Sequence, residues 1–176
     1  GAFNVMEASR RIGVQHLLMA STSSVYGANT KMPFIETEKA DTQLTIYAAT
    51  KKANESMAHA YAHLHDLPTT MFRFFTVYGP WGRPDLALYK FVDAILDGRP
   101  IDIYNNGDMY RDFTYVDDIV DGIIKVSRNS PKGNKDWDPI NPDPSSSFAP
   151  FEVYNIGNSE PVELMTYVSL IEEFLD

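Results

Sequence analysis

The 176-residue sequence lacks cysteine, long apolar runs and an excess of basic residues. Without cysteine there are no disulfide bonds or thiolate metal sites, which fits a reducing compartment, so we expect a cytoplasmic protein. No stretch approaches the roughly 20 consecutive apolar residues that cross a bilayer. No charged, apolar and then small-residue leader is present either, so we expect neither a membrane protein nor a secreted one.

The charge balance argues against nucleic acid as a partner. Lys and Arg number 15 against 24 Asp and Glu, which gives a formal net charge of −9. This charge repels a phosphate backbone, and the basic residues are scattered along the chain instead of forming a patch. A small anionic substrate remains compatible with the sequence, because a few arginines that converge in a cleft can outweigh the overall charge.

Helix and strand patterns alternate over the first part of the chain. The sequence predicts a helix over 3–12, a buried strand over 15–20, a long helix over 45–65 and a strand over 70–77. This alternation is typical of a parallel sheet with helices on its faces. We therefore predict an α/β fold containing a partial Rossmann-like parallel sheet whose N-terminal strands are missing.

The second part of the chain mixes shorter elements, as a smaller α/β substrate-binding lobe does. We expect the sheet domain to cover residues 1–80 and the lobe to cover 81–176. A segment rich in Pro, Ser, Asn and Asp, 129–150, predicts a long mobile loop. The remaining predicted elements are a helix over 86–96, a strand over 101–104, a helix over 116–126, a strand over 151–156 and a helix over 161–175.

Tyr47 and Lys51 stand four residues apart at the start of the long predicted helix, so their side chains rise from the same face. A phenol holds its proton at neutral pH, and a nearby ammonium favours the phenolate that can act as a base. Alone, this pair also fits an ordinary surface pair. Its significance rises because Ser-Thr-Ser-Ser-Val-Tyr-Gly at 21–27 places hydroxyls at the carboxyl end of a predicted parallel strand, where ligands bind in α/β folds.

These motifs together resemble the extended short-chain dehydrogenase/reductase superfamily and, within it, the NAD-dependent epimerase/dehydratase family. The resemblance covers nearly the whole chain, and the segment 73–85 is most similar to UDP-glucuronate 4-epimerases. The motifs that carry it, beyond the run at 21–27, are Tyr-Ala-Ala-Thr-Lys at 47–51, Arg-Phe-Phe-Thr-Val-Tyr-Gly-Pro at 73–80, Arg-Asp-Phe-Thr-Tyr-Val-Asp-Asp at 111–118 and Tyr-Asn-Ile-Gly at 154–157.

The resemblance implies NAD as cofactor and a UDP-sugar as substrate. It implies that Tyr47 takes the proton of the sugar C4 hydroxyl as hydride leaves C4, that Lys51 binds the nicotinamide ribose, and that Thr22 holds the sugar oxygen. The resulting 4-keto sugar turns within the site and takes hydride back on its other face, which inverts C4. The resemblance also implies cofactor contacts at Ser21, Tyr47, Lys51 and Phe74, and substrate contacts at Ser23, Ser24, Thr76, Arg83, Tyr104 and Arg111.

Small differences favour one reaction within the superfamily. Ser23 and Ser24 stand where dehydratases carry Asp-Glu, and hydroxyls cannot do that proton transfer at neutral pH, so elimination of water is disfavoured. Thr76 stands where galactose-type epimerases carry Asn. Arg83 resembles an arginine that can pair with a sugar carboxylate through two hydrogen bonds. Decarboxylation at C5, another sugar nucleotide and a non-catalytic binding or assembly module remain open alternatives.

The sequence departs from the family at its beginning. It contains no Gly-x-x-Gly-x-x-Gly turn, and those glycines allow a helix N-terminus to approach the cofactor pyrophosphate. The chain begins inside a helix pattern without a capping residue and ends as another helix finishes, so we expect both ends to be cuts. We therefore expect this chain alone to bind NAD weakly or not at all, and to be inactive.

Several of these residues also fit plainer roles. Arg73 could equally be a structural residue at a strand end, and Arg83 a solvated loop residue. Tyr104 could equally be an ordinary core aromatic of the lobe. His59 and His63 have a spacing that can bind zinc, but no third ligand is evident, so we expect no metal site.

The predicted helices over 2–12 and 46–65 resemble the pair that forms a four-helix bundle across the family's dimer. The run Ala-His-Ala-Tyr-Ala at 58–62 contains the small residues that close helix packing tolerates. Burial against the rest of the same protomer would give a similar pattern. We expect a homodimer formed through these two helices.

Overall fold

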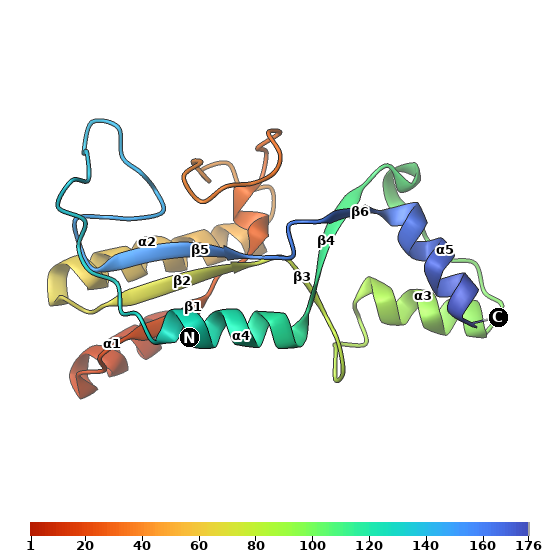
Figure 1. The fold of residues 1–176 in the computed structure, drawn as a ribbon, viewed down its shortest axis with the longest axis horizontal. Helices are drawn as coiled ribbons and strands as arrows, with labels where there is room; N and C mark the ends of the chain where they lie inside the picture. The colour runs from red at the N-terminus through yellow and green to blue at the C-terminus, as the bar shows by residue number, and fades with distance from the viewer. Residues whose placement is uncertain (176) are drawn as a thin grey trace. The chain divides into compact units, whose positions relative to one another are not determined.

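The computed structural model describes residues 1–175 and divides into two compact units (Figure 1). Unit 1 contains residues 1–75 and 120–156, whereas unit 2 contains residues 76–119 and the chain from 157 onward. The expected single boundary at residue 80 is therefore wrong. The chain returns to unit 1 because the strand at 151–156 completes its parallel sheet, a pairing between distant segments that local sequence does not reveal.

Unit 1 contains the predicted parallel sheet. Strands β1 (Leu17–Ala20), β2 (Thr69–Phe74) and β5 (Phe151–Ile156) are arranged in the order β1-β2-β5, and both pairs are parallel. The first five of the six residues of the central strand β2 are buried. Helix α2 (Ile46–His65) connects β1 to β2, as the alternating pattern predicts.

The core of unit 1 lies between this sheet and two helices. Met6 of α1 (Ala2–Ile12) packs with Ala58 and Ala62 of α2, and Met71 of β2 belongs to the same buried cluster. Alanines on α2 leave room for α1 to approach the sheet, so the two helices share one face of it. The second half of α4 (Val116–Ser127) lies in unit 1, with Gly122 against Ile156.

Unit 2 is a smaller α/β unit. Strand β4 (Tyr110–Tyr115) pairs in parallel with β3 (Thr76–Tyr78) and antiparallel with β6 (Pro161–Glu163). Helix α3 (Ala87–Leu96) packs against α5 (Leu164–Leu175). The buried residues of this core are Phe91, Leu164, Val168 and Ile171.

Several predicted elements of unit 2 differ from the structure. The strand expected at 101–104 is absent, and the 3-10 turn η2 (Tyr104–Gly107) stands at its end with Asn105 and Asn106 at φ 51° and 52°. The strand expected over 70–77 is divided into β2 and β3 at Phe75. β4 was not predicted, and residues 161–163 pair with β4 instead of starting the last helix. Pairing with distant segments decides the conformation of β3, β4 and β6.

The segment 129–150 contains no helix or strand, as its composition predicts, but its contacts argue against the expected mobility. Ser147 is buried, and its hydroxyl lies 2.7 Å from Nε2 of His59 on α2. The indole of Trp137 donates a hydrogen bond to the carbonyl of Asp143 at 3.0 Å within the segment. At Gly133 any larger residue would collide with the Phe148 carbonyl. The Ser147 contact attaches the segment to α2, and the other two hold the segment to itself.

Within residues 1–175, no helix is both long and apolar enough to span a membrane.

Candidate functional site

The first group of predicted site residues lies where the parallel strands of unit 1 end. Ala20 of β1 pairs with Phe72 of β2, so the residues that follow each strand emerge at the same edge of the sheet. The chain after β1 forms a short 3-10 helix, η1 (Ser23–Tyr26), instead of a simple turn. Thr22 caps η1, because its Oγ1 accepts a hydrogen bond of 3.2 Å from the backbone N–H of Ser24.

Tyr47 and Lys51 lie at the start of α2, and Lys51 contacts this strand end. The helix begins at Thr45, whose hydroxyl accepts a hydrogen bond of 3.1 Å from the N–H of Ala48 and so satisfies one of the free N–H groups of the first turn. Lys51 Nζ donates a hydrogen bond of 3.1 Å to the carbonyl of Ala20, the last residue of β1. The structure thus brings Lys51 to the strand end that leads into Thr22.

The exposure of Tyr47 suits a role in chemistry. Its side chain is 55% exposed, and the Lys51 ammonium lies 5.9 Å from the centre of its ring. An ammonium has three donors, and the Ala20 carbonyl engages one of them. The remaining donors of Lys51 and the phenol of Tyr47 are therefore available to a ligand at this edge of the sheet.

The structure changes the interpretation of Ser21. Its side chain is buried, and its hydroxyl donates a hydrogen bond of 2.6 Å to Oε1 of Glu55 on α2. The hydroxyl therefore serves the interior of unit 1, and the expectation that it contacts a cofactor is not supported. Phe74, the other residue expected at the cofactor, ends β2 half-buried, with its ring centre 5.7 Å from that of Phe72.

Glu55 is the residue of this site that the sequence did not reveal. It is 3% exposed and receives two hydrogen bonds from Arg73, from Nε at 3.0 Å and from Nη2 at 2.9 Å. Arg73 is fully buried, which decides in favour of a structural role. An available signal was the charged residue within the otherwise apolar and threonine-rich strand β2, since a buried arginine needs an acidic partner.

The charge of Glu55 is set by two opposing effects. Burial by itself raises the pKa of this carboxyl group, but the hydrogen bonds and positive charge of Arg73 lower it more, and the Ser21 hydroxyl and Lys52 add to the lowering. The net result is a lowered pKa. Glu55 is therefore ionised at neutral pH and forms a buried ion pair with Arg73.

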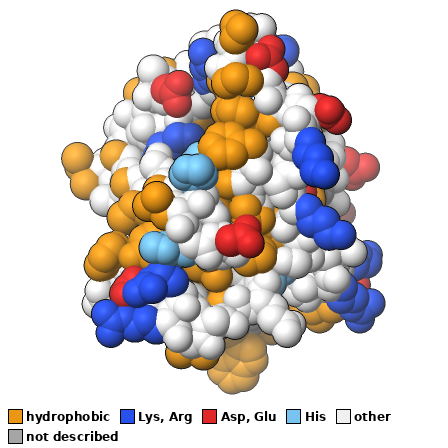
Figure 2. All heavy atoms as spheres, turned by 90° about the vertical axis from the view of Figure 1, so that its left-hand side faces the viewer, with side chains coloured by type: hydrophobic (Ala, Val, Ile, Leu, Met, Phe, Trp, Pro, Cys, Tyr) orange, Lys and Arg blue, Asp and Glu red, His pale blue; other side chains and the backbone are white. Residues whose placement is uncertain are grey.

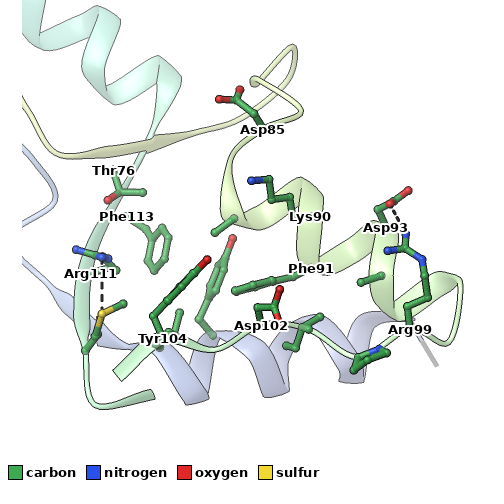
Figure 3. A pocket seen from close by; sticks show the side chains of 17 residues that line it. Thr76, Asp85, Lys90, Phe91, Asp93, Arg99, Asp102, Tyr104, Arg111 and Phe113 are labelled. Atoms are coloured by element: carbon green, nitrogen blue, oxygen red, sulfur yellow. Dashed lines mark hydrogen bonds and ion pairs between the residues drawn. The ribbon is translucent and has the colours of Figure 1, made fainter. Parts of the chain in front are cut away.

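The second group of predicted residues lies in unit 2, around a cavity of about 450 Å³ (Figure 3). Thr76, Tyr104 and Arg111 line this cavity, as expected for residues that share a ligand. Arg83 does not line it; its guanidinium pairs with Asp85, a lining residue, at 2.6 Å. The plainer interpretation of Tyr104 as a core aromatic is wrong, because its side chain is 76% exposed.

The cavity is lined by aromatic rings, by three cationic side chains (Lys90, Arg99 and Arg111) and by three carboxylates (Asp85, Asp93 and Asp102). Thr76 and Arg111 lie at one end of it and the Asp93–Arg99 ion pair at the other, with Tyr104 between them (Figure 3). Lys90 also lines the cavity from α3, a residue that no motif had indicated. Exposed aromatic rings suit a planar base, and cationic side chains suit phosphate groups.

Comparison with known proteins identifies the family. Residues 1–157 match the model of the NAD dependent epimerase/dehydratase family. The chain belongs to this family. Family members use NAD, in agreement with the cofactor that the motifs implied. Within residues 1–175, no group of His, Cys, Asp or Glu side chains is arranged to hold a metal ion.

Two relatives from bacteria are more than half identical to the chain. The chain is 57% identical over 175 residues to Protein CapI of Staphylococcus aureus and 56% identical over 174 residues to a probable UDP-glucuronate 4-epimerase of Rhizobium meliloti (strain 1021). These two matches cover 99% and 98% of this chain but 52% and 51% of the relatives. The chain therefore spans about half the length of the curated relatives it matches.

A solved structure agrees with the fold. The UDP-glucuronic acid 4-epimerase from Bacillus cereus, in complex with UDP-glucuronic acid and NAD, superposes with a TM-score of 0.80 at 28% identity. The match covers 99% of this chain and 50% of that one. Its fold confirms the predicted α/β architecture with a partial Rossmann-like sheet.

Breaking the buried ion pair should destabilise the chain strongly. We expect Arg73→Met to lower the free energy of unfolding by about 3–5 kcal/mol, because it leaves the Glu55 carboxylate buried without its main partner. Urea unfolding followed by circular dichroism measures the change. Arg10→Met is the matched control, since Arg10 makes the same two-bonded contact with Glu7 at the surface. A loss no larger than that of the control would contradict the prediction.

Proposed function

We propose that this chain supplies the catalytic and substrate-binding residues of an NAD-dependent 4-epimerase that interconverts UDP-glucuronate and UDP-galacturonate. The observation that carries the proposal is the hydrogen bond from Lys51, one helical turn from Tyr47 on α2, to the strand end that leads into Thr22. The names of the Rhizobium meliloti relative and of the Bacillus cereus structure support the same reaction. Because the chain spans about half of such proteins, the remaining half is needed for turnover.

The three residues divide the chemistry between them. The Tyr47 phenolate takes the proton of the C4 hydroxyl, and the Lys51 ammonium favours that phenolate through its charge. The Thr22 hydroxyl, on the other side, holds the same sugar oxygen. NAD, when bound, accepts a hydride from C4 and later returns it. Lys51 donors that the Ala20 carbonyl does not use fit the hydroxyls of the nicotinamide ribose, and Phe74 would border the ring.

The reaction is completed when the hydride returns to C4 and Tyr47 protonates the C4 oxygen. The 4-keto sugar turns in the site, Tyr47 gives the proton back to the C4 oxygen, and C4 is inverted without net oxidation. Ser23 and Ser24 lie beside Thr22 in η1 and can hydrogen-bond the sugar. Neither can act as the acid or base that loss of water would need, which favours epimerisation over dehydration.

The residues of unit 2 suit the nucleotide and the sugar carboxylate. We assign the uracil to Tyr104 and the diphosphate to Arg111, which both line the cavity, with Thr76 at its edge. Arg83 would bind the carboxylate of the hexuronate in place of Asp85, its partner in the present structure. Decarboxylation at C5 is the main rival on the same scaffold, and it would release carbon dioxide from this carboxylate.

The assembly that we propose is a homodimer through α1 and α2. Exposed apolar side chains on α1 include Val5 and Ile12, at 51% and 78% exposure, and Leu64 on α2 is 69% exposed. Exposed alanines recur along α2 at positions 49, 53 and 60, which allows close helix contact. Apolar side chains also form a band on the side of the molecule seen in Figure 2.

Activity can be tested in a chimera in which residues 1–176 replace the matching segment of the Rhizobium meliloti relative. With UDP-glucuronate we expect UDP-galacturonate as product, measured by chromatography. Tyr47→Phe should reduce kcat by about 10²–10⁴-fold, because it removes the proton acceptor. Tyr61→Phe, further along α2, is the control and should stay near wild type. Carbon dioxide release would favour the decarboxylase instead, and full activity of Tyr47→Phe would contradict the mechanism.

The 176-residue chain alone should bind the nucleotide UDP but should not bind the cofactor NAD tightly. Calorimetry should detect UDP binding, because the cavity lies within unit 2, and should detect no tight binding of NAD, because the chain lacks the glycine turn for the pyrophosphate. Arg111→Met should weaken UDP binding by about 10-fold or more. Arg128→Met is the control, because Arg128 is exposed and belongs to unit 1. Micromolar affinity for NAD would overturn the expectation.

The dimer can be tested by sedimentation of the chimera. Ala53→Arg places a long charged side chain on the exposed face of α2 and should shift the protein toward monomer. Ala28→Arg, at an exposed position outside the two helices, should leave the dimer intact. A wild-type chimera that sediments as a monomer at micromolar concentration would contradict the proposed assembly.

A further inference from the structure

The end of β1 is held by contacts that come from two other elements. The backbone N–H of Ser21 donates a hydrogen bond of 2.6 Å to the Phe72 carbonyl of β2. From α2, Lys51 donates to the Ala20 carbonyl at 3.1 Å, and Glu55 accepts from the Ser21 hydroxyl at 2.6 Å. The residue that follows these contacts is Thr22. Its place relative to α2 is therefore determined by side chains of α2 itself.

Glu55 is the centre of this arrangement. It follows Lys51 by four residues and Tyr47 by eight on α2, so the three side chains lie along one side of the helix. Arg73 holds the Glu55 carboxylate from β2 with two hydrogen bonds. A carboxylate fixed in this way can hold the Ser21 hydroxyl in one position, whereas a free side chain would allow several.

Arg73 also supports the other side of Thr22. Its guanidinium carbon lies 4.7 Å from the ring centre of Tyr26, which belongs to η1 and is fully buried. The hydroxyl of Tyr26 donates a hydrogen bond of 2.8 Å to Asn155 of β5. The short segment between Ser21 and Tyr26 is thus fixed at both ends, through Glu55 at one and through Arg73 directly at the other.

We propose that Glu55 and Arg73 are positioning residues for the reaction, acting through Ser21 to set the place of the Thr22 hydroxyl relative to Tyr47. This inference rests on the proposed function. Neither residue acts on the substrate, because Glu55 is 3% exposed and Arg73 is fully buried. Their effect is geometric: Thr22 and Tyr47 come from different elements and must meet the same sugar oxygen, and small misplacements of reacting groups reduce rates steeply.

The test uses Ser21→Ala in the chimera, because this change removes the link to Thr22 and leaves the Glu55–Arg73 pair intact. We expect kcat to fall by about 10–100-fold, with unchanged KM for UDP-glucuronate and unchanged NAD content. Thr69→Val is the matched control. It removes another buried hydroxyl of unit 1, one that donates to the Leu67 carbonyl at the opposite end of β2. It should lower the melting temperature to a similar degree without lowering kcat.

A double-mutant cycle tests whether Ser21 acts through Glu55. Glu55→Gln keeps the shape of the side chain, and the double variant Ser21→Ala/Glu55→Gln should lose no more kcat than Glu55→Gln alone. Additive losses would show that Ser21 acts independently and would overturn the inference. The inference is also overturned if Ser21→Ala retains the wild-type kcat, or if Thr69→Val lowers kcat as much as Ser21→Ala does.

A second measurement separates this inference from the proposed function. If the wild-type chimera does not convert UDP-glucuronate, the proposed function fails, and the positioning role is then tested by hydrogen–deuterium exchange. In that measurement Ser21→Ala should increase deuterium uptake in peptides covering 21–27, and Thr69→Val should not. Equal uptake in the two variants would overturn the positioning role.

Discussion

The structure of unit 1 depends on one buried ion pair. Arg73, near the end of the central strand, carries a charge that water cannot reach, and the Glu55 carboxylate is its main compensating partner. The pair joins the long helix to the central strand, and the Ser21 hydroxyl extends it to the neighbouring strand. Apolar packing would hold α2 against the sheet as firmly, but it would not fix which turn of the helix lies opposite the end of β1.

The fixed position of α2 along the sheet matters for the function that we propose. In the mechanism that we propose, Tyr47 and Lys51 act only if the first turns of α2 lie beside the strand end, and a helix packed by alanines can slide more easily than one held by directional bonds. The directional contacts are the hydrogen bond that Lys51 donates to the Ala20 carbonyl and the one that the Ser21 hydroxyl donates to Glu55. A buried charged network of this kind contributes a unique arrangement more than it contributes net stability, because removing charges from water is costly.

The two units divide the chemistry. In the reaction that we propose, unit 1 supplies the groups that move a proton, whereas unit 2 contains a cavity lined by aromatic and charged side chains. The chain passes between the units repeatedly, so the strand that ends at Phe74 in one unit continues almost directly into Thr76 in the other. Lys90 and Arg111 lie at this cavity together with three carboxylates, so the anionic nucleotide that we propose would depend on individual contacts and not on a net positive charge.

The sequence alone was sufficient for the parts that depend on local pattern. Alternating apolar segments predicted β1, α2 and β2, since such periodicity follows from which face of an element is buried. The four-residue spacing of Tyr47 and Lys51 predicted their common face, and the motifs indicated the family that the comparison then confirmed. Short strands such as β4 and β6 escaped prediction, because their conformation comes from pairing with distant segments.

Only the tertiary structure decided the partners of individual side chains. It showed that the Ser21 hydroxyl is engaged by Glu55, that Arg73 is an interior residue, and that β5 returns to the first unit. It also placed Lys90 at the cavity of unit 2. The physical reason is the same throughout: hydrogen bonds and ion pairs join residues far apart in the chain, and a sequence records each residue without recording which distant residue will satisfy it.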